Sequence, residues 1–205
     1  MGDPWRLERF VAAQERGGTY QRAVTELRAG IKVSHWMWFV FPQVAGLGLS
    51  AMSREYAISS VAEARAYLAH PVLGSRLREC ARVVEATEGR SAGAIFGPVD
   101  AVKLRSSMTL FAAAAEADEA EGDGAEADRA EGGGAEAGEA ETAETGRPRT
   151  AASAAGGQAP GEPDGNVFRA VLAKYFGGAA DEETLARLLG PADPASRRAD
   201  EKENP

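Results

Sequence analysis

Cysteine and histidine are scarce in this sequence. Cys80 is the single cysteine among 205 residues, and there are two histidines. One cysteine cannot form an internal disulfide, so nothing points to an oxidising compartment. So few thiol and imidazole ligands also cannot build a zinc site of the Cys/His type. We therefore expect neither a metal nor a cofactor.

Long apolar runs are missing as well. The run at residues 36–41 is six residues long and ends at a proline, whereas a membrane-spanning helix needs about 20 apolar residues. The first residues, Met1 to Arg6, lack the apolar stretch of a secretory signal peptide. We expect a soluble, cytoplasmic protein with no membrane partner.

Aromatic residues are absent from one long stretch of the chain. Residues 112–165 consist almost entirely of Ala, Glu, Gly, Asp, Thr and Pro, with fourteen acidic residues against three arginines. Such a composition cannot bury enough apolar surface to offset the entropy lost on folding. We expect a disordered acidic insert there and a disordered tail at 191–205. All fourteen aromatics lie in 1–111 and 166–190, which we expect to form one compact domain.

The net charge changes sign when the insert is set aside. The whole chain carries −8, but the insert contributes −11 and the tail −1, so the expected domain carries +4. Nucleic-acid binding requires a dense stripe of Lys and Arg, and +4 over 136 residues does not supply one. We expect no nucleic-acid partner.

Helix start and stop signals recur throughout the expected domain, and no convincing pair of strands appears. Capping residues, glycine or proline stops and apolar residues at helical spacing predict helices near 4–16, 20–29, 51–57, 61–70, 71–88, 98–111, 167–176 and 182–189. Ser60, in a capping box with Glu63, and Asp181 are among the expected caps, and a short element is expected near 91–95. The run 35–40 predicts a brief helix capped by Ser34, with a buried strand as the alternative. The fold is expected to be mainly α. The helices on either side of the insert should pack together because both end in aromatic residues.

Polar residues stand among large aromatic ones in the segment 32–43. The candidates for ligand binding here, together with a serine after the glycine-rich 46–48, are Lys32, Ser34, His35, Trp36, Trp38, Gln43 and Ser50. Each has a structural alternative, because a histidine or tryptophan can belong to the core and a serine can cap a helix. In the functional interpretation the imidazole titrates near neutrality, the indoles stack on a planar ligand, and the helix start at Ser50 attracts an anion.

A second polar stretch occupies residues 100–111. Asp100, Lys103 and Ser107 are spaced at i, i+3 and i+7, which places them on one face of a helix. The simplest interpretation is an exposed ion pair between Asp100 and Lys103. Alternatively, Lys103, Ser106 and Ser107 crowd donors together in a way that suits a phosphate or carboxylate.

Several of these segments carry a family resemblance. KVSHWMWFVFPQ at 32–43, GLGLS at 46–50, YLAHPVLGSRL at 67–77, FGPVDAVKL at 96–104 and SSMTLF at 106–111 resemble domain-of-unknown-function family 1810, whose members are sometimes labelled calpastatin-like. The resemblance implies a small, largely helical, single-domain bacterial fold and supplies no activity.

The leading hypothesis is a polar and aromatic pocket that binds, or processes, an anionic metabolite. By analogy with small helical proteins linked to NAD and ADP-ribose, the expected ligand is a nucleotide or an NAD/ADP-ribose-like molecule. If a reaction occurs, His35 is the expected acid or base, and Asp100 is its expected carboxylate partner or a second base. A shared pocket requires Lys32 or His35 to lie within about 8 Å of Lys103 or Ser107.

The rival hypothesis is a non-catalytic interaction module. In that case the same polar residues satisfy buried backbone groups, and the surface or the acidic insert binds a protein or covers a basic site. The positions of the two polar stretches relative to each other discriminate between the two hypotheses.

Overall fold

The computed structural model describes residues 2–130 and 166–190, and the regular structure of this part is helical apart from one isolated bridge between Val44 and Ile58. The mainly α prediction is confirmed. The helices are α1 (Glu8–Glu15), the 3-10 helix η1 (Arg16–Gly18), α2 (Thr19–Arg28), α3 (Met37–Val40), α4 (Ala51–Glu55), α5 (Val61–Ala69), α6 (Leu73–Ala86), α7 (Ala92–Ala130), α8 (Asn166–Phe176) and α9 (Glu182–Leu189).

Three of the helix starts are capped as the sequence predicts. The side chains of Ser50, Ser60 and Asp181 each accept a hydrogen bond from the backbone N–H three residues further on, at the starts of α4, α5 and α9. This bond satisfies one of the donors that a helix start leaves free. The segment near residue 35 is helical rather than extended, but α3 begins after Trp36, without a side-chain cap.

The first helix begins later than expected. Arg6 has a φ of 52°, a left-handed conformation that cannot continue a helix from Pro4. The carboxylate of Asp3 instead accepts a hydrogen bond at 3.0 Å from the backbone N–H of Glu8, the first residue of α1. Asp3 therefore contributes to the start of α1 from five residues upstream.

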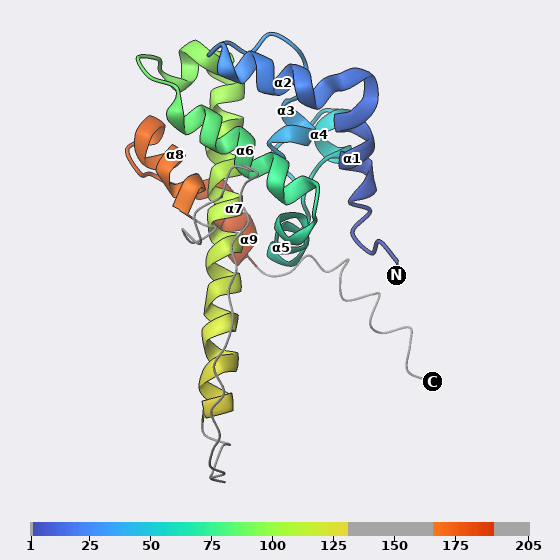
Figure 1. The fold of residues 1–205 in the computed structure, drawn as a ribbon, viewed down its shortest axis with the longest axis vertical. Coiled ribbons are helices and arrows are strands. Elements are labelled where there is room, and N and C mark those ends of the chain that lie inside the picture. Colours follow the sequence, from blue (N-terminus) through green and yellow to red (C-terminus); the bar gives the residue numbers. More distant parts are fainter. Residues whose placement is uncertain (1, 131–165, 191–205) are drawn as a thin grey trace, which may run out of the picture.

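The longest helix, α7, runs through the middle of the molecule and continues beyond the other helices (Figure 1). It is interrupted at Gly97, whose φ of 74° and ψ of 167° lie outside the helical region, and Pro98 opens the second segment. Positive φ favours glycine, and proline suits a first helical turn. The merged helix therefore contains both the short element expected near 91–95 and the helix expected from Pro98.

The structure differs from the expectation of disorder at the first residues of the expected insert. Helix α7 continues to Ala130, and Ala112, Ala114 and Ala115 are buried. Alanine has the highest helix propensity and its small side chain allows close packing, so an alanine run without aromatics can still join a core. The rest of the expected insert, 131–165, and the tail 191–205 lie outside the described residues.

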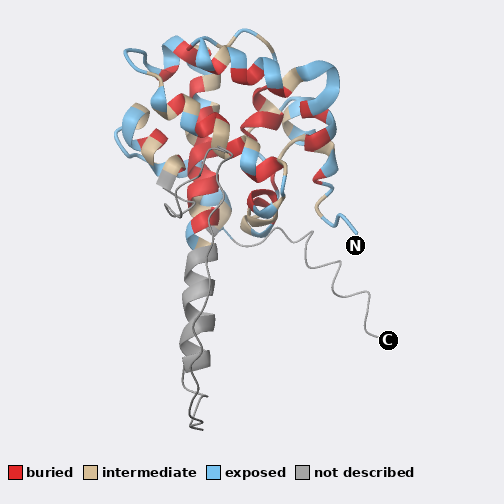
Figure 2. Ribbon diagram, viewed as in Figure 1, coloured by how far each residue is buried: buried red, intermediate tan, exposed pale blue. Residues whose placement is uncertain are grey.

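A chain of aromatic rings joins the parts of the core that come from either side of the insert. Phe10 contacts Tyr67, Tyr67 contacts Phe111, and Phe111 contacts Phe168, with ring centroids 5.1, 5.3 and 5.9 Å apart. These rings come from α1, α5, α7 and α8, and buried residues extend along α7 within the body of the molecule (Figure 2). The expected packing of α7 against α8 is confirmed, and α6 packs against α8, α5 and α2.

Candidate functional site

The loop between α2 and α3 is held by one carboxylate, that of Glu26 in the last turn of α2. Its oxygens accept hydrogen bonds from the Val33 backbone N–H at 2.8 Å, the Ser34 hydroxyl at 2.5 Å and the Trp36 indole N–H at 2.8 Å. Burial opposes ionisation of Glu26, but these hydrogen bonds prevail and lower its pKa to about 2. The loop is thus organised around a charge supplied by the preceding helix.

The loop is also bound to α7, by contacts on both sides of the break at Gly97. The Lys32 backbone N–H donates to the Ile95 carbonyl at 2.7 Å, and the Lys32 ammonium lies 2.6 Å from one carboxylate oxygen of Asp100. The other carboxylate oxygen accepts a hydrogen bond from the Lys103 ammonium at 2.7 Å. One carboxylate therefore bridges two ammonium groups, and we name this group the Lys32–Asp100–Lys103 cluster.

The cluster is largely shielded from water. The side chains of Lys32, Asp100 and Lys103 are 7%, 17% and 22% exposed. Burial alone would raise the pKa of Asp100, but the hydrogen bonds and positive charges of the two lysines lower that pKa below its usual range. Asp100 is thus an ionised counter-ion at neutral pH, which does not suit the expected role of a proton acceptor.

Two tryptophan rings flank the cluster. The Lys32 ammonium lies 5.1 Å from the ring centroid of Trp36, and the Lys103 ammonium lies 4.8 Å from that of Trp38. Both distances permit a cation–π interaction. Trp36 is completely buried, whereas Trp38 is half-buried. Of the two expected aromatic ligand contacts, Trp38 alone retains access to solvent.

Ser106, expected to contact a ligand, has a hydrogen-bond partner within the fold. Its hydroxyl lies 3.1 Å from the carboxylate of Asp181, the residue that caps α9. Thr109 accepts the Asp181 backbone N–H at 2.9 Å, and Arg105 donates to the carbonyls of Ala179 and Ala180. This polar face of α7 therefore binds the start of α9, which lies about seventy-five residues further along the chain.

The remaining expected site residues each have a different environment. Ser34 bonds to Glu26, and Ser50 caps α4. His35 is exposed and makes no hydrogen bond or ion pair with the part of the chain that the structure describes, so the expected pair with Asp100 is not formed there. Through its backbone carbonyl, Gln43 accepts a bond from Ile58. Ser107 is fully buried, and its hydroxyl has no partner among the described residues.

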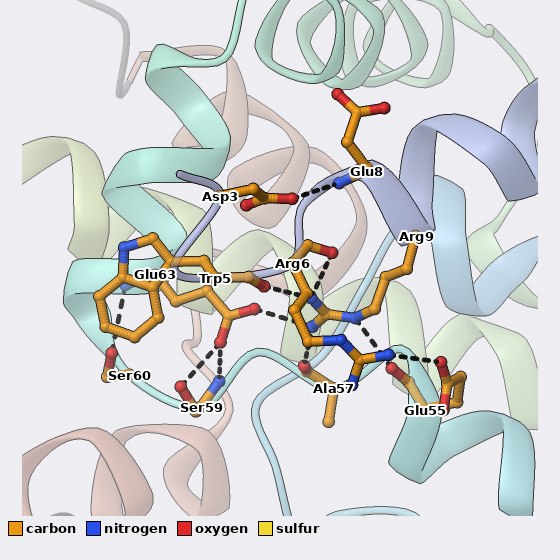
Figure 3. Close-up of polar contacts among 10 residues, drawn as sticks. All are labelled: Asp3, Trp5, Arg6, Glu8, Arg9, Glu55, Ala57, Ser59, Ser60 and Glu63. Atoms are coloured by element: carbon orange, nitrogen blue, oxygen red, sulfur yellow. Dashed lines mark hydrogen bonds and ion pairs between the residues drawn. The ribbon is translucent and has the colours of Figure 1, made fainter. Parts of the chain in front are cut away.

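A second buried charge pair joins the N-terminal segment to α5 (Figure 3). The Arg9 guanidinium lies 2.8 Å from the carboxylate of Glu63, whose other oxygen accepts the backbone N–H and the hydroxyl of Ser59. Arg9 also donates to the carbonyls of Trp5 and Ala57. Since partners surround both charges, this cluster holds the chain together rather than presenting donors to a ligand.

Sequence reasoning did not identify Glu26, Arg9 or Glu63 as organising residues. Glu63 was interpreted only as part of the capping box with Ser60, and nothing in the spacing of Glu26 distinguishes it from a solvated helix residue. The one available signal is that four donors, at Val33, Ser34 and Trp36, lie close together in a loop and need an acceptor.

Two pockets of the described part are lined by none of the expected site residues. One, of about 480 Å³, lies where α2 and α6 end, and the other, of about 460 Å³, lies between α7, α8 and α9. Among residues 2–130 and 166–190 there is no group of three or more His, Cys, Asp or Glu side chains arranged to hold a metal ion. None of the helices in those ranges is long and apolar enough to cross a membrane.

The fold and the cluster define an all-helical protein whose loop after α2 is bound by charge to its central helix. The model of the family described as protein of unknown function (DUF1810) matches residues 4–124, and the chain belongs to this family. It is similar to the conserved hypothetical protein Rv1873 from Mycobacterium tuberculosis, with 41% identity and a TM-score of 0.67 over 92% of this chain and 100% of that one. No curated protein shows significant similarity to it.

Proposed function

We propose that the protein binds an anionic small molecule, such as a nucleotide or an NAD/ADP-ribose-like metabolite, at the Lys32–Asp100–Lys103 cluster beside Trp38. The observation that carries this proposal is the sharing of one carboxylate between two ammonium groups. The cluster has a net charge of one positive unit in a poorly solvated place, where an anion is attracted more strongly than at an open surface.

Within the cluster, Lys103 is the residue suited to contact the ligand. An ammonium group has three N–H donors, and the hydrogen bond from Lys103 to Asp100 uses one of them. Lys32 is more deeply buried and also donates to the Ser34 carbonyl at 2.9 Å. We therefore assign Lys32 and Asp100 to the positioning of Lys103. Glu26 is the other nearby carboxylate, and it is engaged with the loop.

Trp38 would bind the planar part of the ligand. Its ring lies beside the Lys103 ammonium and is half-buried, so a base or nicotinamide ring could stack on it while Lys103 binds a phosphate or carboxylate. Because His35 and Asp100 are not paired, the proposal is restricted to binding and assigns no proton transfer.

The test is a titration of tryptophan fluorescence and of thermal stability with AMP, NAD, ADP-ribose and inorganic phosphate. Lys103→Met should weaken binding of the active compound at least about tenfold, the usual effect of losing a charge-assisted hydrogen bond. Lys174→Met is the matched control, because Lys174 is an exposed lysine on α8 that bonds to the Glu85 carbonyl.

Trp38→Phe shows where the fluorescence signal arises, since the chain contains only three tryptophans. The change in fluorescence on binding should disappear in this variant while Trp5 and Trp36 continue to emit. Failure of all four compounds to bind, or equal affinities of the Lys103→Met and Lys174→Met variants, would overturn the proposal.

One observation favours a second candidate function, the binding of a protein partner. Four exposed aliphatic side chains, Ile31, Val33, Val99 and Val102, flank the lysines and the aspartate of the cluster in sequence. Groups of exposed apolar residues mark interaction surfaces. The wild-type protein, used as bait in a bacterial extract, should retain a bound protein, and the double variant Val99→Asp with Val102→Asp should not. Leu49→Asp, which changes another exposed apolar residue, should retain it as the wild type does. Equal retention by both variants would exclude this surface.

A further inference from the structure

The pocket where α2 and α6 end contains two arginines on a partly apolar floor. Its volume is about 480 Å³, and its lining includes Arg28 and Arg90 together with Val83, Ala86 and Gly30. This volume lies within the range of about 300–1,000 Å³ that is usual for small-molecule sites. The pocket is separate from the Lys32–Asp100–Lys103 cluster, none of whose residues lines it.

The Arg90 side chain has no charged or hydrogen-bonding partner within residues 2–130 and 166–190, although it lies close against the backbone. A Cβ added to Gly30 would come within 3.0 Å of Arg90 Cδ and 3.2 Å of Arg90 Nε. Gly30 also has a φ of 66°, which ends α2 in a left-handed turn. Glycine at this position thus provides both the turn and the space in which Arg90 lies beside the pocket.

Arg28, the other arginine that lines the pocket, has a weak partner. Its guanidinium lies 3.3 Å from the carboxylate of Glu79, and the two side chains are 66% and 44% exposed. Exposed pairs of this kind contribute little and leave an arginine free to bind another anion. Glu79 is itself held by the hydroxyl of Tyr20 at 2.6 Å, so it need not move when Arg28 turns toward the pocket.

The loop after α6 adds unused backbone donors to the same pocket. The N–H groups of Glu88, Gly89 and Arg90 donate no hydrogen bond within the described residues, and Glu88 and Arg90 line the pocket. Consecutive free N–H groups in a turn attract oxyanions. The carboxylate of Glu88 opposes an anion, but it is exposed and can turn toward solvent.

Several carbonyl groups at the two helix ends already accept hydrogen bonds from other donors. Glu26 accepts the Ile31 N–H through its carbonyl at 3.1 Å. At the end of α6, the Val84 and Thr87 carbonyls accept the Tyr175 hydroxyl at 2.7 and 3.1 Å, and the Glu85 carbonyl accepts the Lys174 ammonium. The negative ends of the helix dipoles are therefore partly compensated before any ligand binds.

We propose that this pocket binds a phosphate monoester between the guanidinium groups of Arg28 and Arg90. A carboxylate has two oxygens and suits one guanidinium fork, whereas a phosphate monoester has three terminal oxygens and can bind two forks and a backbone N–H together. The apolar floor formed by Val83 and Ala86 accommodates the carbon part of the ester. This site is independent of the one proposed at Lys103.

The probe is glycerol 3-phosphate, with inorganic phosphate and succinate for comparison, titrated while the backbone amides are observed by NMR. Shifts are expected at Gly30 and at 88–90. Arg90→Met and Arg28→Met should each weaken the binding at least about tenfold. Arg16→Met is the matched control, because Arg16 is an exposed arginine just before α2, at the other end of that helix.

The Lys103→Met variant separates this proposal from the previous one. If the pocket is the site, Lys103→Met binds glycerol 3-phosphate as the wild type does. Binding lost in Lys103→Met but kept in Arg90→Met would overturn the present proposal and assign the phosphate to Lys103. Tighter binding of succinate than of glycerol 3-phosphate would overturn the assignment of the ligand class. Absence of amide shifts at about 10 mM glycerol 3-phosphate would overturn the site itself.

Discussion

Replacement of Asp100 by asparagine keeps the size of the side chain and removes the charge that holds two ammonium groups together. Lys32 is 7% exposed and lies 2.6 Å from the carboxylate, and Lys103 lies 2.7 Å from it. Two ammonium groups bound to one carboxylate are on the order of 5 Å apart, where their repulsion is about 3 kcal/mol at an effective dielectric constant near 20. Asp100→Asn removes the attraction that offsets this repulsion, so we expect it to lower the free energy of unfolding by about 3 kcal/mol, the lower end of the range for a broken buried ion pair.

The assay is urea denaturation at pH 7, followed by tryptophan fluorescence and circular dichroism. Lys103→Met should cost less than about 1 kcal/mol, because the pair between Lys32 and Asp100 stays neutral and the methionine can still cover Trp38. The double variant Asp100→Asn with Lys103→Met should be more stable than Asp100→Asn alone, because one of the two repelling charges is gone. A value for Asp100→Asn within about 0.5 kcal/mol of wild type would refute the assignment of Asp100 as the counter-ion of both lysines.

The pH dependence of stability provides an independent check on the same residue. The pKa of Asp100 is lowered in the folded protein, so the folded state binds its proton less readily than the unfolded state does. Its contribution to stability is therefore complete above the unfolded pKa, about 3.9, and is lost as the pH falls through the lower folded pKa. The difference in unfolding free energy between wild type and Asp100→Asn should shrink in that acidic range and stay constant from about pH 5 to about pH 7.

Two further predictions concern the residues that hold the loop and the last helix. Glu26→Gln should destabilise the protein by about 1–2 kcal/mol at pH 7, because the hydrogen bonds to Ser34 and Trp36 become weaker. Since the pKa of Glu26 is lowered to about 2, the difference from wild type should decline as the pH falls from about 4.5 toward 2. An unchanged urea midpoint at pH 7 would contradict this prediction. Asp181→Ala should lower the free energy of unfolding by about 2 kcal/mol, because it removes the cap of α9 and leaves the buried Ser106 hydroxyl without this partner. Hydrogen exchange should become faster in α9 and stay unchanged in α5. Equal protection of α9 in the variant and the wild type would argue against this role of Asp181.

The features that could be predicted from the sequence are those set by neighbours along the chain. Ser50, Ser60 and Asp181 cap helices because a cap and its N–H lie three residues apart. The packing of α7 against α8 was predicted from the aromatic residues on either side of the insert, and the contact between Phe111 and Phe168 confirms the packing, although Phe111 lies within α7 rather than at its end. Local periodicity and capping therefore determined most of the helix order.

The parts of the candidate site that could not be predicted depend on contacts between distant segments. Ser106 looked available for a ligand because its partner Asp181 is far away in sequence, and Glu26 resembled an ordinary surface residue of α2. The disorder expected from residue 112 was inferred from composition. That inference did not account for the small volume of Ala112, Ala114 and Ala115, which lets them pack against a neighbouring helix. The pairing of Asp100 with Lys103 was local and predictable, whereas the addition of Lys32 was not.

The chain of aromatic contacts from Phe10 to Phe168 has a consequence for folding during synthesis on the ribosome. Everything up to α7 emerges before Phe168 and the cap of α9 exist, so a newly made chain displays the side of Phe111 and the hydroxyl-bearing side of Ser106 to the surrounding cell. Closing the loop between Phe111 and Phe168 costs only about 3.5 kcal/mol of chain entropy. This cost arises before the contacts made by Phe168 and Asp181 can stabilise the fold. Until the last two helices have been made, these surfaces lack their partners, and incompletely folded chains with exposed apolar surface are prone to aggregate.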